Sequence, residues 1–108
     1  MQQQRSPLFS LYEDDVDLEE DLHTFVVGLA ETVDSLQDAG SNRDLGMLIK
    51  LSLALVDDAL RFGYPPLKAI AGSVHSAGEA GKDDAIEDAL IELTEIARRV
   101  RLGHRGAA

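Results

Sequence analysis

The chain of 108 residues contains no cysteine. This absence excludes disulfide bonds, thiol nucleophiles and thiolate ligands for zinc or iron–sulfur clusters. Apolar runs are also far shorter than the roughly 20 residues that a membrane-spanning helix requires. The first residues, MQQQRSPLF, have one positive charge and no apolar block of the roughly 7 to 15 residues typical of a signal peptide. We therefore expect a soluble, cytoplasmic, single-domain protein without a membrane partner.

Basic residues are scarce, because 10 Lys and Arg stand against 20 Asp and Glu and the formal net charge is −10. Such a charge repels phosphate backbones, so we expect no nucleic-acid partner. The positive side chains gather near the C-terminus, at Arg98, Arg99, Arg101, His104 and Arg105. We interpret them as complementing the negative end of a helix dipole.

Alternation of apolar and polar residues, which is typical of strands, is absent, whereas four segments have apolar residues at helical spacing. The predicted helices run from about Asp15 or Asp17 to Ala39, from about Asn42 to Phe62, from about Pro66 to Ala80, and from Asp83 or Asp84 to about residue 102. Glycines at 40, 63 and 81 are predicted to end the first three. The expected N-caps are Ser41 or Asn42 for the second helix and Asp83 or Asp84 for the last.

The connections between these segments are short, which favours antiparallel neighbours. We predict an all-α, antiparallel, up-and-down four-helix bundle over residues 15–102. A partly ordered N-terminal segment, 1–14, precedes it and a flexible tail, 103–108, follows it. Residues 7–12 are apolar enough to form a short helical turn over one end of the bundle.

The second predicted helix carries two apolar stripes, although a bundle helix needs only one. The first contains Leu48, Leu55, Ala59 and Phe62, and the second contains Ile49, Leu53, Val56 and Leu60. The stripes lie about 120° apart around the helix. The second stripe is open to three interpretations: it is buried by neighbouring elements such as residues 8–12, it pairs with a second copy, or it binds another protein.

The second and third predicted helices, with FGYPPL between them, resemble the histidine-containing phosphotransfer (HPt) domain of bacterial two-component relays. That family is a four-helix bundle of about this length, and the resemblance extends over residues 17–100 in architecture. The matching positions are Leu55, Ala59, Phe62, Gly63 and Leu67. The resemblance implies a partner such as a receiver domain or a histidine kinase.

Three positions depart from the family pattern. Leu53 stands where the family has its phospho-accepting histidine, Val56 where it has lysine, and Asp57 where it has glycine. Leucine cannot accept a phosphoryl group and valine offers no balancing charge. The resemblance therefore implies a protein-binding module without phosphotransfer or other enzymatic activity. Its partner surface would contain Ile49, Leu53, Val56 and Leu60, with Asp57 at the polar rim.

Two alternatives are an active histidine phosphocarrier that uses His75 and a structural homodimer. Glu20 and His23 form an E-x-x-H pair of the kind found in di-iron bundles, but those sites need the pair twice and two further glutamates. Neither a glycine-rich phosphate loop nor a Ser-His-Asp combination is present in the sequence. We expect no metal and no other cofactor.

Overall fold

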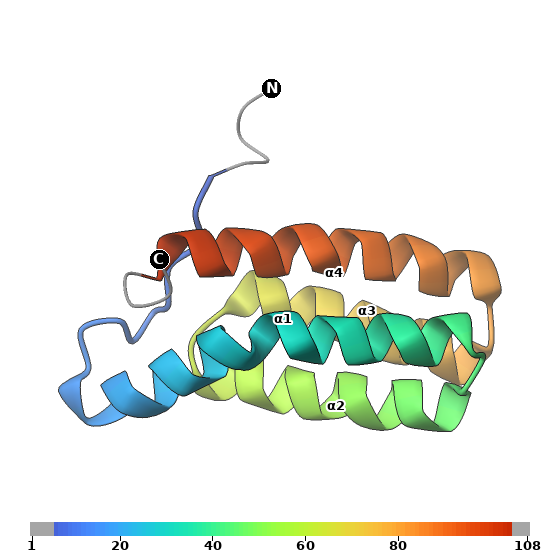
Figure 1. Cartoon of the computed structure of the whole chain (residues 1–108), viewed down its shortest axis with the longest axis horizontal. Coiled ribbons are helices and arrows are strands. Elements are labelled where there is room, and N and C mark those ends of the chain that lie inside the picture. Colours follow the sequence, from blue (N-terminus) through green and yellow to red (C-terminus); the bar gives the residue numbers. More distant parts are fainter. Residues whose placement is uncertain (1–5, 105–108) are drawn as a thin grey trace.

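The computed structural model describes residues 6–104, and this part of the chain contains helices and turns but no strand. A short 3₁₀ helix, η2 (Val16–Leu18), leads into α1 (Glu19–Ser41), α2 (Leu45–Arg61), α3 (Pro65–Ala80) and α4 (Asp83–Gly103). Each long helix packs against the next in sequence, and α4 closes the ring against α1 (Figure 1). The prediction of an all-α four-helix bundle is confirmed.

None of the helices within residues 6–104 has the length and apolar character that crossing a membrane demands.

The core is formed by the apolar face that each helix repeats every three or four residues. In α1 the buried side chains are Leu22, Val26, Leu29, Val33, Leu36 and Ala39. The other three helices contribute leucine, isoleucine, valine and alanine side chains to the same cluster. Burial of each large aliphatic side chain stabilises the fold by about 1.5–3 kcal/mol, so this shared interior determines how the helices are arranged.

Helices α2 and α3 have the most extensive mutual contact, because small residues lie between them. A Cβ atom at Gly78 would lie 3.2 Å from both Ile49 Cγ1 and Leu48 Cδ2. Ser52 is fully buried, and its Oγ donates a hydrogen bond to the Ile49 carbonyl at 3.1 Å. Ile49 therefore lies on the flank of α2 that faces α3.

The predicted turn between these helices is confirmed. Gly63 has φ of 78°, and Pro65 opens α3, where its missing N–H costs no helical hydrogen bond. Gly81 has φ of 66° and ends α3, as the sequence indicated.

The turn between α1 and α2 differs from the prediction. Helix α1 continues through Gly40 to Ser41, and Arg43 takes the left-handed conformation, with φ of 57°. The cap of α2 is neither Ser41 nor Asn42 but Asp44, whose side chain accepts a hydrogen bond from the Met47 N–H. Gly40 is used for packing instead, since a Cβ there would lie 2.8 Å from Leu90 Cδ1.

The start of α4 also corrects the prediction. Its N-cap is Lys82, which makes no side-chain capping bond, and Asp83 and Asp84 belong to the first turn. Their negative charges complement the helix dipole there, and Asp83 also pairs with Arg43.

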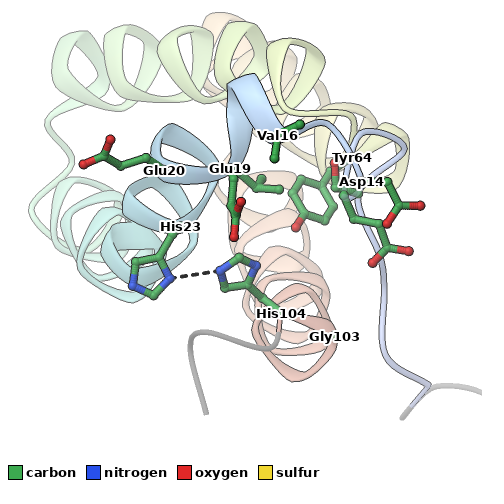
Figure 2. Close-up of a pocket in the computed structure, with 11 residues that line it drawn as sticks. Asp14, Val16, Glu19, Glu20, His23, Tyr64, Gly103 and His104 are labelled. Carbon is green, nitrogen blue, oxygen red and sulfur yellow. Dashed lines mark hydrogen bonds between the residues drawn. The ribbon is translucent and has the colours of Figure 1, made fainter.

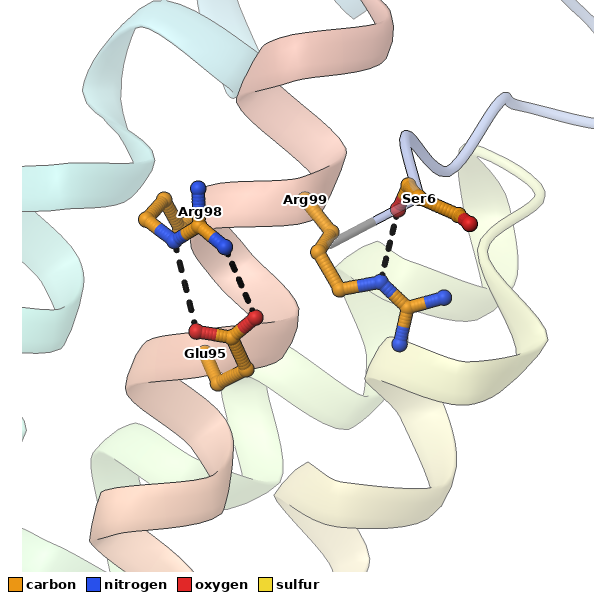
Figure 3. A network of polar contacts seen from close by, with 4 residues as sticks. All are labelled: Ser6, Glu95, Arg98 and Arg99. Atoms are coloured by element: carbon orange, nitrogen blue, oxygen red, sulfur yellow. Dashed lines mark hydrogen bonds and ion pairs between the residues drawn. The ribbon is translucent and has the colours of Figure 1, made fainter. Parts of the chain in front are cut away.

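The N-terminal segment crosses one end of the bundle (Figure 1). The Leu8 N–H donates to the Arg99 carbonyl and the Leu11 N–H to the Gly63 carbonyl, both at 2.9 Å. Figure 3 shows the Arg99 Nε donating to the Ser6 carbonyl on one side of α4, while Arg98 makes a bidentate pair with Glu95 on another side of the same helix. This segment, from residue 6 to the turn at 11–14, is called the strap below.

Three details of the terminal segments need correction. Residues 7–12 do not form the expected helical turn, and the short helix lies later, in η2. Gly103 belongs to α4 rather than to a tail, and His104 directly follows the helix. The rest of the predicted tail, 105–108, and the first five residues lie outside the described part of the chain.

Replacement of Gly63 by alanine is expected to lower the free energy of unfolding by about 1–3 kcal/mol. The positive φ strains any residue with a side chain, and the new Cβ would lie 3.0 Å from the Leu11 backbone nitrogen. Gly72→Ala is the control, because a Cβ there meets nothing within 4 Å and should stabilise α3 by about 0.5–1 kcal/mol. Urea unfolding measures both changes, and equal stability of Gly63→Ala and wild type would contradict the expectation.

Candidate functional site

The second apolar stripe of α2 reaches solvent. Leu53 is 49% exposed and Leu60 is 61% exposed, whereas Ile49 and Val56 are half-buried. Asp57 is exposed, as expected for a polar rim. The strap, which includes residues 8–12, is bonded across the end of the bundle and leaves Leu53 open. Burial inside the monomer therefore accounts for part of Ile49 and Val56 but does not explain Leu53 and Leu60.

The stripe follows the flank of α2 beside α3, whereas the opposite flank is occupied by contacts with α1. There Phe62 stacks on Phe25 with 4.9 Å between ring centroids, and Arg61 pairs with Asp21 at 3.3 Å. Burial on that flank raises the pKa of Asp58, although Arg61 opposes the shift. The neighbouring residue differs, because Asp58 is half-buried whereas Asp57 is exposed to water.

His75 lies on α3, one helical turn before Gly78. Gly78 lies opposite Ile49, and the two helices run antiparallel. Moving back three residues along α3, from Gly78 to His75, therefore corresponds to moving forward about three residues along α2, which places His75 beside Ser52 and Leu53. Its side chain is only 22% exposed, and Nδ1 lies 3.7 Å from a Glu79 carboxylate oxygen. A carboxylate at this distance repels a phosphoryl group, so these surroundings are unfavourable for a phosphohistidine.

A second candidate site is a cleft of about 590 Å³ at the end of the bundle where the strap lies. Three separate parts of the chain form its walls: the strap with η2, the first turns of α1, and the end of α4. Tyr64, from the turn between α2 and α3, lies at its base. Figure 2 shows the acidic side chains and the two histidines around this space.

His23 and His104 meet in the cleft. Their Nδ1 and Nε2 atoms are 3.1 Å apart, and one nitrogen donates to the other according to the tautomers present. Partial burial, and then the neighbouring His23, lower the pKa of His104. The contact therefore favours neutral His104. This pair was not predictable from local sequence patterns, because its members are separated by 81 positions.

The E-x-x-H pair does not converge on a common point, because Glu20 points away from the two imidazoles in Figure 2. Within residues 6–104 no group of three or more His, Asp or Glu side chains is arranged to hold a metal ion.

Tyr64 is 2% exposed, and its ring lies 6.3 Å from that of Phe25. Its hydroxyl points into the cleft (Figure 2) and makes no hydrogen bond with any residue in the described range. Burial, with a smaller contribution from the negative charge of Glu13, raises the pKa of Tyr64 to about 12. The phenol consequently stays protonated and can both donate and accept a hydrogen bond.

Comparison of the chain with models of known protein families, with curated proteins and with solved structures gives no match. The resemblance to HPt domains stays a prediction, which depends on the residues of the α2–α3 turn.

The titration of Tyr64 is directly measurable, because the chain has no tryptophan and only one other tyrosine, Tyr12. In a Tyr12→Phe variant, tyrosinate absorbance should reach its half-change near pH 12. Because the folded pKa lies above the ordinary value of 10.0, this group's contribution to stability is complete below pH 10 and is lost as the pH rises toward 12. A half-change near pH 10, with the fold intact, would show that the phenol is not shielded.

Proposed function

We propose that this protein is a cytoplasmic protein-binding module that uses the α2 stripe and has no phosphotransfer activity. The observation that carries the proposal is the exposure of Leu53 and Leu60 on a helix that already has a complete buried face. Leaving large aliphatic side chains in water forgoes burial energy, and adjacent exposed apolar side chains commonly mark a binding surface.

The size of the stripe favours a transient complex. Four side chains, two of them half-buried, contribute much less than the roughly 800 Å² per partner that a standard interface buries. Only a larger surface that includes neighbouring polar residues would reach that area. A signalling contact, which forms and dissociates readily, fits this surface better than a permanent subunit interface.

Charge favours a different protein over a second copy. Two chains that each carry −10 repel one another, and this repulsion opposes a weak apolar contact. A neutral or positively charged partner does not meet this repulsion. The HPt resemblance suggests the receiver domain of a response regulator, which in that family docks on the corresponding face of the second helix. The proposed role is therefore recognition of such a domain in two-component signalling.

The alternative with an observation in its favour is phosphate transfer by His75, since the register brings this residue to the level of Leu53. Its limited exposure and the Glu79 carboxylate weigh against it. Incubation with a phosphorylated receiver domain tests it. We expect no acid-labile label on this protein, and a label that disappears in His75→Gln would replace the binding-only function with a phosphocarrier.

Substitution Leu53→Asp should weaken binding to a receiver-domain partner by about tenfold to a hundredfold, because it places a charge where a leucine is buried on binding. Met47→Asp is the matched control, since Met47 is 43% exposed on the same helix but outside the stripe. Titration calorimetry against receiver domains from the same genome measures both variants. Equal affinities of the two variants, or no binding by wild type to any of these domains, would count against the proposal.

Self-association is tested separately by light scattering over a range of protein concentrations. The wild-type chain should remain monomeric, because the net charge opposes pairing of like copies. A dimer that dissociates in Leu53→Asp but persists in Met47→Asp would instead assign the stripe to a homodimer interface.

A further inference from the structure

The cleft at the strap end carries negative charge that no Lys or Arg of the described residues balances. Its lining includes Glu13, Asp14, Glu19 and Glu20, and no Lys or Arg among residues 6–104 contributes to it. The ion pairs formed in this part of the chain use other acids, namely Asp21, Glu79, Asp83 and Glu95. Several carboxylates around one volume give it a negative potential, which attracts a cation.

Tyr64 supplies independent evidence for a ligand. Its side chain is almost fully buried, yet its hydroxyl has no partner among the described residues and points into the same cleft (Figure 2). A phenylalanine would fill the same interior space without placing a polar atom at the base of the cleft. The hydroxyl thus offers a hydrogen bond that residues 6–104 do not use.

The remaining walls indicate which cation fits. Leu22, Val16 and the Tyr64 ring give the cleft an apolar part, and its volume of about 590 Å³ is within the range of small-molecule sites. The acceptors are distributed around this volume, and the described residues offer no cluster with the geometry of a metal site. Separated acceptors beside apolar surface match a chain of methylene groups that ends in ammonium groups.

We propose that this cleft binds a linear aliphatic polyamine, with ammonium groups on the carboxylates of Glu19 and the strap and with the Tyr64 hydroxyl as a further hydrogen-bond partner. The methylene groups would lie against Val16 and Leu22. The His23–His104 pair forms one wall and, when neutral, adds no competing positive charge. This site lies at the end of the bundle and does not depend on the function proposed for the α2 stripe.

Titration calorimetry with spermidine, a linear triamine, at neutral pH and low salt tests the proposal. Wild type should bind with a stoichiometry of one, and amide shifts in NMR spectra should map to the cleft. Glu13→Gln/Glu19→Gln should weaken binding by more than roughly tenfold, and Tyr64→Phe by roughly tenfold. Thermal unfolding of Tyr64→Phe should resemble that of wild type, because the deleted hydroxyl has no partner within the described part of the chain.

The matched control is Glu31→Gln/Asp34→Asn, which removes two exposed charges from α1 far from the cleft lining. It should retain the wild-type affinity. If both double variants weakened spermidine binding equally, the affinity would depend only on the net charge of the protein. This result would overturn the proposal. Absence of saturable binding would overturn it too. So would a single Zn²⁺ ion that binds in place of spermidine and is lost in His23→Gln.

Discussion

The close packing of α2 against α3 is the contact on which the rest of the molecule depends. Gly78 leaves space for Leu48 and Ile49, and Ser52 satisfies its own hydroxyl within α2 while it is fully buried. A larger residue at either position would separate the helices and lose many contacts at once. This packing also fixes the rotation of α2 about its axis. Because Ile49 must face α3, Leu53 and Leu60 are carried to the outer edge of the same flank.

The two candidate sites have different physical origins. The α2 stripe belongs to one helix and arises from an excess of apolar residues over those that a bundle can bury. The cleft belongs to no single element, and it exists because the strap, α1, the α2–α3 turn and α4 meet at one end. The α2 stripe therefore offers apolar area without a concave surface, whereas the cleft offers charge, volume and the hydroxyl of a buried tyrosine. They suit partners of different kinds.

The helices, the turn at Gly63 and the apolar stripe were predictable because each depends on neighbouring residues in the sequence. The cap of α2 was not, because Arg43 took the left-handed conformation that the glycine three positions earlier could have supplied. Gly40 was instead required for contact with Leu90, which is distant in sequence. The cleft was missed for the same reason, since its histidines are 81 positions apart and Tyr64 looked like an ordinary turn residue. Residues close in sequence determine where helices begin and end. Contacts between residues distant in sequence determine which polar side chains meet, and the sequence pattern does not reveal these contacts.

The strap is attached to the bundle less firmly than the helices are attached to one another. It is joined to the bundle by main-chain hydrogen bonds to Arg99 and Gly63, by the buried Ser10 hydroxyl and by the Arg99 side chain, while most of its other side chains face water. Detaching it would cost far less free energy than separating the helices, because little apolar surface would be uncovered. One wall of the cleft can thus open while the four helices remain packed. Amide protons of the strap should consequently exchange with solvent well before those of the core.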